Sequence, residues 1–181
     1  MLTEFQKRKL IKLFSMYDTT HNGSLAHQDF EKIAKRIIDL RNWSRRSPRC
    51  QILSNKYEYK WKRLLAKADK AHDQEICLDE WYAYHDLVLS DGALYEEEIE
   101  SLMRIVIDAL DTDEDGKIDQ HDWGNFLSIY SVSPVYVHLV FPQIDSDQKG
   151  FLDRDEILKL IFEFYHGNEP DSHANFMFGP Y

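Results

Sequence analysis

The segment DSDQKGFLDRDE, residues 145–156, decides the fold of this chain, and a close relative, DTDEDGKIDQHD, occupies residues 111–122. In both segments carboxylates stand at positions 1, 3, 9 and 12, and a glycine stands at position 6. A hard divalent cation takes about six to eight oxygen ligands, which such a set supplies. The glycine allows the chain to turn through positive φ. Two copies in register, 34 residues apart, predict a repeated cation-binding loop.

These loops resemble the calcium loop of the EF-hand, in which position 7 contributes its backbone carbonyl. A third copy, loop 1, reads DTTHNGSLAHQD at residues 18–29, and we number 111–122 as loop 3 and 145–156 as loop 4. The predicted metal ligands are Asp18, Thr20, Asn22, Ser24 and Asp29 in loop 1, Asp111, Asp113, Asp115, Lys117, Asp119 and Asp122 in loop 3, and Asp145, Asp147, Phe151, Asp153 and Glu156 in loop 4.

Residues 69–80, which we number loop 2, are a degenerate copy of the same pattern. Ala71 offers no oxygen at position 3, and Gln74 replaces the glycine at position 6. A residue other than glycine costs about 1 kcal/mol in the left-handed region. We expect loop 2 to hold no metal and to persist because the loops work in pairs, with Ile76 bridging to Leu25 at position 8.

The three predicted metal loops differ in their ligands. Loops 1 and 3 end in Asp29 and Asp122, which reach less easily than glutamate for bidentate coordination, so Mg²⁺ should compete there. Loop 4 ends in Glu156 but carries Lys149 at position 5, and an ammonium has no lone pair to donate. Water must replace that ligand, or the site is weakened. We therefore expect up to three Ca²⁺ ions.

Helical spacing of apolar residues on both sides of each loop predicts an all-α fold. We expect four EF-hand helix–loop–helix units in two paired lobes that form one compact domain, with short β-bridges between paired loops. The predicted parts are an N-terminal pair (1–90), a C-terminal pair (91–167) and an apolar tail (168–181) that packs back on the body. Ser133 and Pro134 predict the start of a helix, and Pro142 predicts a kink within it.

The charge of the chain is divided unevenly. Residues 1–90 hold 17 Lys and Arg against 12 Asp and Glu, whereas residues 91–181 hold 5 against 20. Nine cations gather between residues 41 and 67. They form either a solvated helix face, or a docking surface for an acidic protein partner or for the acidic half of the same protein. Nucleic acid is not expected, because an acidic protein repels phosphate.

The whole chain resembles the sarcoplasmic calcium-binding protein family, including its calerythrin-like and calexcitin-like members. Luciferin-binding proteins and calcium-triggered photoproteins share this layout of four hands, a long first gap and a silent second hand. The resemblance implies a compact protein that binds up to three cations at loops 1, 3 and 4. It also implies a C-terminal tail that returns to the body.

We expect a calcium-binding protein that acts as a Ca²⁺ or Ca²⁺/Mg²⁺ buffer or as a signal modulator. The alternatives are a Ca²⁺ sensor with a protein target and a calcium-responsive carrier of an apolar small ligand. No enzyme motif occurs, so no catalytic residue is predicted. The N-terminal residues show no secretory signal, no stretch is long enough to span a membrane, and the two cysteines lack a motif spacing. We expect a cytoplasmic monomer.

Overall fold

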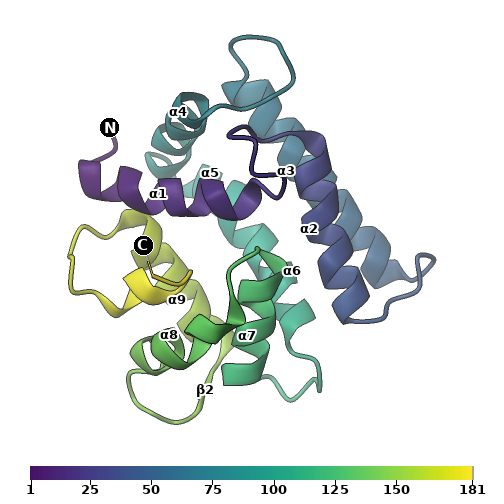
Figure 1. The fold of residues 1–181 in the computed structure, drawn as a ribbon, viewed down its shortest axis with the longest axis vertical. Helices are drawn as coiled ribbons and strands as arrows, with labels where there is room; N and C mark the ends of the chain where they lie inside the picture. The colour runs from purple at the N-terminus through teal and green to yellow at the C-terminus, as the bar shows by residue number, and fades with distance from the viewer. Residues whose placement is uncertain (181) are drawn as a thin grey trace.

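The computed structural model describes residues 1–180 and consists of four helix–loop–helix units (Figure 1). The N-terminal pair contains α1 (Glu4–Tyr17), α2 (His27–Leu40), α3 (Pro48–Ala68) and α4 (Leu78–Leu89). The C-terminal pair contains α5 (Gly92–Tyr95), the π-helical turn η1 (Glu96–Glu100), α6 (Ser101–Leu110), β1 (Ile118–Asp119), α7 (Gln120–Ile129), the 3₁₀ turn η2 (Pro134–Tyr136), α8 (Val137–Ile144), β2 (Phe151–Leu152) and α9 (Arg154–His166). A second 3₁₀ turn, η3 (His173–Phe176), lies in the tail.

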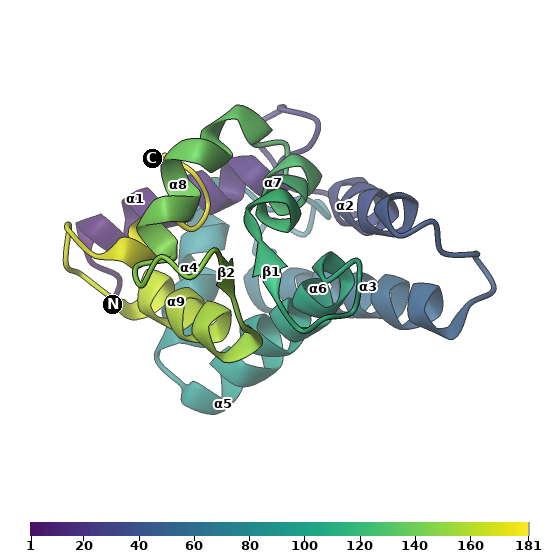
Figure 2. The ribbon, with the colours of Figure 1, turned by 90° about the horizontal axis from the view of Figure 1, so that it is seen from below.

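Loops pair through the apolar residues at their eighth positions. Leu25 and Ile76 exchange two backbone hydrogen bonds of 2.9 Å, so loop 1 is joined to the degenerate loop 2. β1 and β2 pair in antiparallel fashion with Ile118 opposite Leu152, which joins loops 3 and 4 (Figure 2). The predicted short bridges between paired loops are confirmed, including the contact of Ile76 with Leu25.

The residues at loop positions 9 and 12 also start the leaving helices. Asp119 and Asp153 are the N-caps of α7 and α9, and the position 12 carboxylates Asp122 and Glu156 bond back to the N-cap amides. Such reciprocal capping satisfies backbone donors that the first helical turn leaves open. One short sequence therefore ends the loop, begins the helix and fixes where two predicted ligands lie.

One aromatic core joins the two pairs of hands. The Tyr57 and Tyr130 hydroxyls, from α3 and the end of α7, lie 2.8 Å apart within hydrogen-bond distance. Tyr17 packs edge-on against Tyr130 at 5.5 Å between ring centroids. Trp81 and Trp123, each 1% exposed, anchor the two halves within a single cluster of buried side chains. The two halves therefore share their apolar interior.

The tail packs against the C-terminal pair. Met177 is fully buried and Phe178 is 4% exposed, with the Phe178 ring against Phe126 and Phe164. The indole of Trp123 donates to the Met177 carbonyl at 3.2 Å. The yellow η3 segment lies beside α8 and α9 in Figure 1. Tyr181, which we included in the apolar tail, lies outside the described residues.

Two local predictions were met only in part. A helical segment does start at Pro134, but its first turn is the 3₁₀ turn η2, which leads directly into α8, and the Ser133 side chain makes no capping hydrogen bond. α8 continues through Pro142 and ends two residues later at Ile144, so the proline does not break the helix, and the kink stays a prediction. The connection between α4 and α5 consists of Ser90 and Asp91, and the Asp91 carboxylate caps the helical run from α5 through η1 to α6.

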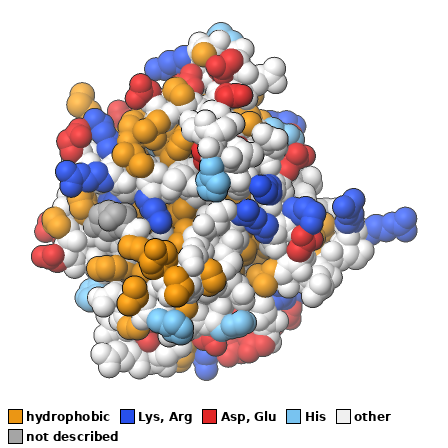
Figure 3. Space-filling model, in the orientation of Figure 1, with side chains coloured by type: hydrophobic (Ala, Val, Ile, Leu, Met, Phe, Trp, Pro, Cys, Tyr) orange, Lys and Arg blue, Asp and Glu red, His pale blue; other side chains and the backbone are white. Residues whose placement is uncertain are grey.

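The basic segment 41–67 contacts the acidic half of the same chain. Arg63 pairs with Glu97 at 3.1 Å and Glu98 at 2.7 Å, and Arg49 pairs with Glu114 at 2.6 Å. Figure 3 shows further blue side chains at the right, on the protruding arm formed by α2 and α3. Of the alternatives stated above, docking on the protein's own acidic half is the one these contacts support.

Within residues 1–180, no helix combines the length and the apolar character that crossing a bilayer requires.

Candidate cation-binding loops

All four loops share one backbone conformation. Position 4 adopts a left-handed φ of 55–62° in every loop, at His21, His72, Glu114 and Gln148. Position 6 does the same, with φ of 79–85° at the three glycines and 63° at Gln74. The degenerate loop 2 therefore keeps the geometry of the others without the glycine that favours it.

Position 1 organises each predicted metal loop from within. The carboxylate of Asp18 accepts from the Asn22 and Gly23 amides at 3.2 and 2.9 Å. Asp111 accepts from Asp115 and Gly116 in the same way, at 3.1 and 2.9 Å. Corresponding bonds hold Asp145 in loop 4. These bonds curl the chain around the position where a cation would be held, so the backbone needs little further ordering.

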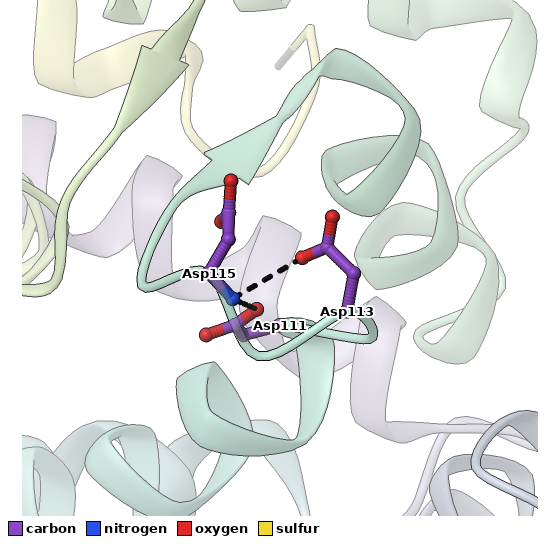
Figure 4. A group of neighbouring side chains, drawn as sticks. All are labelled: Asp111, Asp113 and Asp115. Atoms are coloured by element: carbon purple, nitrogen blue, oxygen red, sulfur yellow. Dashed lines mark hydrogen bonds between the residues drawn. The ribbon is translucent and has the colours of Figure 1, made fainter.

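Loop 3 brings three carboxylates together. Asp111, Asp113 and Asp115 offer oxygen atoms that all lie within 4.8 Å of one another, and the three side chains gather on one side of the loop (Figure 4). An all-oxygen donor set of this size suits a hard cation such as Ca²⁺ or Mg²⁺. Of the predicted loop 3 ligands, Asp119 and Asp122 do not belong to this group, because their carboxylates bond to the start of α7.

Threonine at position 2 is a feature of the site that sequence reasoning missed. In loop 1 the Thr19 amide and hydroxyl donate to the Asp29 carboxylate at 3.0 and 2.7 Å. In loop 3 the Thr112 hydroxyl donates to Asp122 at 3.4 Å. Both loops that end in the shorter aspartate carry this threonine, and that shared pair of residues could have indicated the contact from the sequence. Burial raises the pKa of Asp122, and the Thr112 hydroxyl opposes that shift.

In loop 4 a lysine side chain of the loop occupies part of the predicted metal site. The Lys149 ammonium contacts the Glu156 carboxylate directly and lies 3.7 Å from Asp147. The Glu156 side chain raises the pKa of Lys149, so the ammonium stays charged. The other Glu156 oxygen accepts from the Asp153 amide at 2.8 Å. A predicted position 12 ligand is therefore already paired with a positive charge inside the loop.

Loop 2 is closed by its own backbone. Glu80, at position 12, accepts from the amides of Lys70 and Cys77 at 2.8 and 3.0 Å. Desolvation, the largest single influence, raises the pKa of Glu80, but the bonds from these amides and others outweigh it, and the net shift of the pKa is downward. Asp69 Oδ1 is buried without a hydrogen-bond partner within residues 1–180. Loop 2 offers fewer side-chain oxygens than loop 3, and its lack of metal stays a prediction.

Comparison with known proteins agrees with this architecture. The EF-hand family model matches residues 102–127 and 137–161, which contain loops 3 and 4. Calerythrin of Saccharopolyspora erythraea is 24% identical over 169 residues, covering 92% of this chain and 96% of calerythrin. The luciferin-binding protein of Renilla reniformis is 24% identical and covers 97% of this chain and 94% of its own length. The solved structure of an amphioxus sarcoplasmic calcium-binding protein superposes with a TM-score of 0.79 at 20% identity, covering 100% of both chains.

The helix–loop–helix units around loops 3 and 4, which match the EF-hand model, make this an EF-hand protein. This chain is related to calerythrin and to the sarcoplasmic calcium-binding proteins, and the EF-hand family implies Ca²⁺ as its cation.

Proposed function

We propose that this chain binds Ca²⁺ at loops 1 and 3, in competition with Mg²⁺, and acts as a calcium buffer. The observation that carries the proposal is the preformed backbone of these loops, in which the position 1 carboxylate already accepts from the amides at positions 5 and 6. Because such a loop needs little rearrangement to bind a cation, binding changes the conformation of the protein little, as expected for a buffer. Asp29 and Asp122 favour the six-coordinate geometry that Mg²⁺ accepts.

Loop 4 is proposed as a third, weaker site. Its ligands Asp145, Asp147, Asp153, Glu156 and the Phe151 carbonyl have the required spacing. A Ca²⁺ ion would have to displace the Lys149 ammonium from Glu156 before that carboxylate could coordinate it. We therefore expect two ions to bind at low Ca²⁺ concentration and a third only at higher concentration.

The buried tail favours a buffer over a sensor. A sensor hand opens an apolar groove when calcium binds, whereas a buffer hand barely changes. In this protein Met177 and Phe178 fill the space beside α7 and α9, and Trp123 is bonded to the tail backbone. The tail therefore covers apolar side chains of the C-terminal pair that would otherwise be open to a target.

The test is a calorimetric Ca²⁺ titration at a constant physiological Mg²⁺ concentration, repeated with a dye that brightens on apolar surface. Two to three bound ions with a flat or falling dye signal support the buffer. A clear rise in dye fluorescence on Ca²⁺ binding would instead identify a sensor with a protein target. No bound ion at millimolar Ca²⁺ would contradict the proposal altogether.

The carrier alternative finds little support in the interior. Luciferin-binding protein is a relative. The interior of this protein contains a cavity lined by Tyr17, Trp81, His85 and Tyr165. Within residues 1–180 that cavity measures about 10 Å³, room for a single water molecule and not for an organic ligand. We therefore place ligand carriage behind the buffer.

A further inference from the structure

Helix α2, which leaves loop 1, and its C-cap residue Arg41 place three cationic side chains on backbone carbonyls of other segments. Lys32 Nζ donates to the Thr19 carbonyl in loop 1 at 3.1 Å. Arg36 Nη1 donates to the Ile129 carbonyl at 2.6 Å, and Arg41 Nη1 donates to the Asp111 carbonyl at 2.7 Å. α2 therefore touches both its own loop and the third hand, and Figure 2 shows it beside α7.

The two arginines meet the carboxyl ends of both helices of the third hand. Ile129 is the last residue of α7, and Asp111 directly follows the last residue of α6. The last carbonyls of a helix lack partners within the helix and carry the negative end of its dipole, so guanidinium donors stabilise them. The Arg41 side chain is only 8% exposed, which limits replacement by water.

A second contact ties Arg41 to loop 3 itself. Its Nη2 lies 3.4 Å from Glu114, at the left-handed position 4 of loop 3, and Arg49 pairs with the same carboxylate at 2.6 Å. Asp111 is both the position 1 carboxylate of loop 3 and the residue whose carbonyl Arg41 holds. The arginine therefore fixes the residue on which the loop conformation depends.

Loop 1 fixes the other end of α2. Asp29 lies in the first turn of α2, is fully buried, and accepts from Thr19 in the loop. From Asp29 to Arg41 is 12 residues, about 18 Å along a helix axis. α2 is uninterrupted to Leu40 and its C-cap Arg41 keeps helical backbone angles, so the stretch moves as one body and a change at Asp29 reaches Arg36 and Arg41.

We propose that α2 couples loop 1 to loop 3, with Arg36 and Arg41 as the positioning residues, so that a cation in either loop strengthens binding in the other. The inference rests on the proposed function, which assigns cations to both loops. The contacts of Arg36 and Arg41 hold loop 3 in its folded conformation. A cation in loop 1 that fixes the position of α2 therefore favours binding at loop 3. Because coupling free energies are reciprocal, loop 3 must strengthen loop 1 equally. The coupled loops belong to different pairs and share no β-bridge.

The test is a thermodynamic cycle that follows each loop separately by the amide NMR signals of Gly23 and Gly116. Loop 1 is disabled with Asp18→Asn in two backgrounds, the natural chain and the Arg36→Met/Arg41→Met double variant. In the natural background we expect Asp18→Asn to raise the Kd of loop 3 by about fivefold or more. In the double variant we expect a change of less than about twofold.

The outcomes separate the two proposals. If Gly23 does not respond to Ca²⁺ in the natural chain, loop 1 binds no ion, and the proposed function at that loop fails together with the coupling. If Gly23 responds but Asp18→Asn leaves the Kd of loop 3 unchanged, only the coupling is overturned. Equal coupling in both backgrounds would overturn the role of the arginines.

A readout without metal tests the same contacts. In chelator, Arg41→Met should accelerate hydrogen exchange of the Gly116 amide, while Arg46→Met, an exposed arginine between α2 and α3, should leave it unchanged. Arg41→Lys keeps the charge but loses the second donor to Glu114, and we expect an intermediate rate. Unchanged exchange in Arg41→Met would contradict the positioning role, and this single variant serves if the double variant does not fold.

Discussion

At the scale of single residues, loop 2 keeps the backbone conformation of a metal-binding loop although it lacks several of the ligands. Gln74 has a left-handed φ of 63°, in the same region as the glycines at position 6 of the other three loops, although loop 2 offers fewer ligands. The pairing of Ile76 with Leu25 requires this shape whether or not a metal is bound. The cost of the left-handed conformation is borne by packing and hydrogen bonds such as those to Glu80.

Gln74→Gly should therefore stabilise the metal-free protein. Removing the Cβ relieves a conformation that costs about 1 kcal/mol, partly offset by the greater freedom of glycine in the unfolded chain. We expect a net gain of about 0.5 kcal/mol in the free energy of unfolding. Urea denaturation in chelator measures it. Gln51→Gly, in the exposed part of α3, is the matched control and should lose about 1 kcal/mol.

Lys149→Asp should convert loop 4 into a stronger site. The change removes the ammonium that contacts Glu156 and adds a carboxylate at position 5, where loop 3 has Asp115. We expect the Ca²⁺ affinity of loop 4 to rise about tenfold or more in a calorimetric titration. Lys159→Asp makes the same charge change on the exposed face of α9 and should leave the affinity nearly unchanged. An equal gain in both variants would show that net charge alone is responsible.

The sequence predicted the loops well because their ligands follow at fixed intervals in one short segment. It could not predict which other side chains bond to those ligands in the folded protein. The Thr19 bond to Asp29, the Lys149 contact with Glu156 and the Arg41 bond to Asp111 depend on side-chain reach and on how the units pack together. The ligand assignments themselves stay predictions until metal binding is measured.

At the scale of elements, helices predicted from apolar spacing are present around all four loops, whereas the connections between units were predicted less well. The π-helical turn η1 within the run from α5 to α6 left no readable signal, since its sequence EEEIE suits an ordinary helix. The turn places Glu98 in the interior, where Arg63 and Tyr84 bond its carboxylate. Tertiary partners, which the sequence pattern does not show, determine this local geometry.

The tail is an element whose contribution can be measured directly. Phe178→Ala should lower the free energy of unfolding by about 3 kcal/mol, because it opens a cavity among Phe126, Phe164 and Met177. Phe162→Ala is the matched control on the neighbouring helix α9, where the ring is 51% exposed. We expect that control to lose less than about 1 kcal/mol. Similar losses in both would mean that the tail adds little stability.

At the scale of the whole molecule, a buried polar network joins the halves beside the shared aromatic core. Lys60 from α3 donates to the Tyr84 hydroxyl at 2.8 Å and to the Glu98 carbonyl at 2.9 Å. Desolvation lowers the pKa of Lys60 from 10.5 to about 7, although Glu98 opposes the shift. Burial also lowers the pKa of Lys9, which bonds the Gly167 carbonyl beside the tail, to about 8.

These lysines predict how stability changes with pH. Each has a lower pKa in the folded protein than in the unfolded chain, so the unfolded state binds more protons between about pH 7 and 10.5. The free energy of unfolding should therefore rise with pH in that window, by about 1.4 kcal/mol per pH unit for each proton released on folding. Denaturation in chelator from pH 6.5 to 9.5 measures the slope. Lys60→Met should reduce it, while Lys159→Met on the surface of α9 should keep it; an unchanged slope in Lys60→Met would contradict this assignment.

The bond from the Trp123 indole to the Met177 carbonyl also means that intrinsic tryptophan fluorescence can follow the tail. Trp123 immediately follows Asp122, the last residue of loop 3, and its hydrogen-bond acceptor lies in the tail. In the N-terminal half, the Trp81 indole donates instead to the Leu10 carbonyl of α1 at 3.0 Å. The emission wavelength of Trp123 should thus report tail release, and that of Trp81 should report separation of α1 from α4, without any attached label.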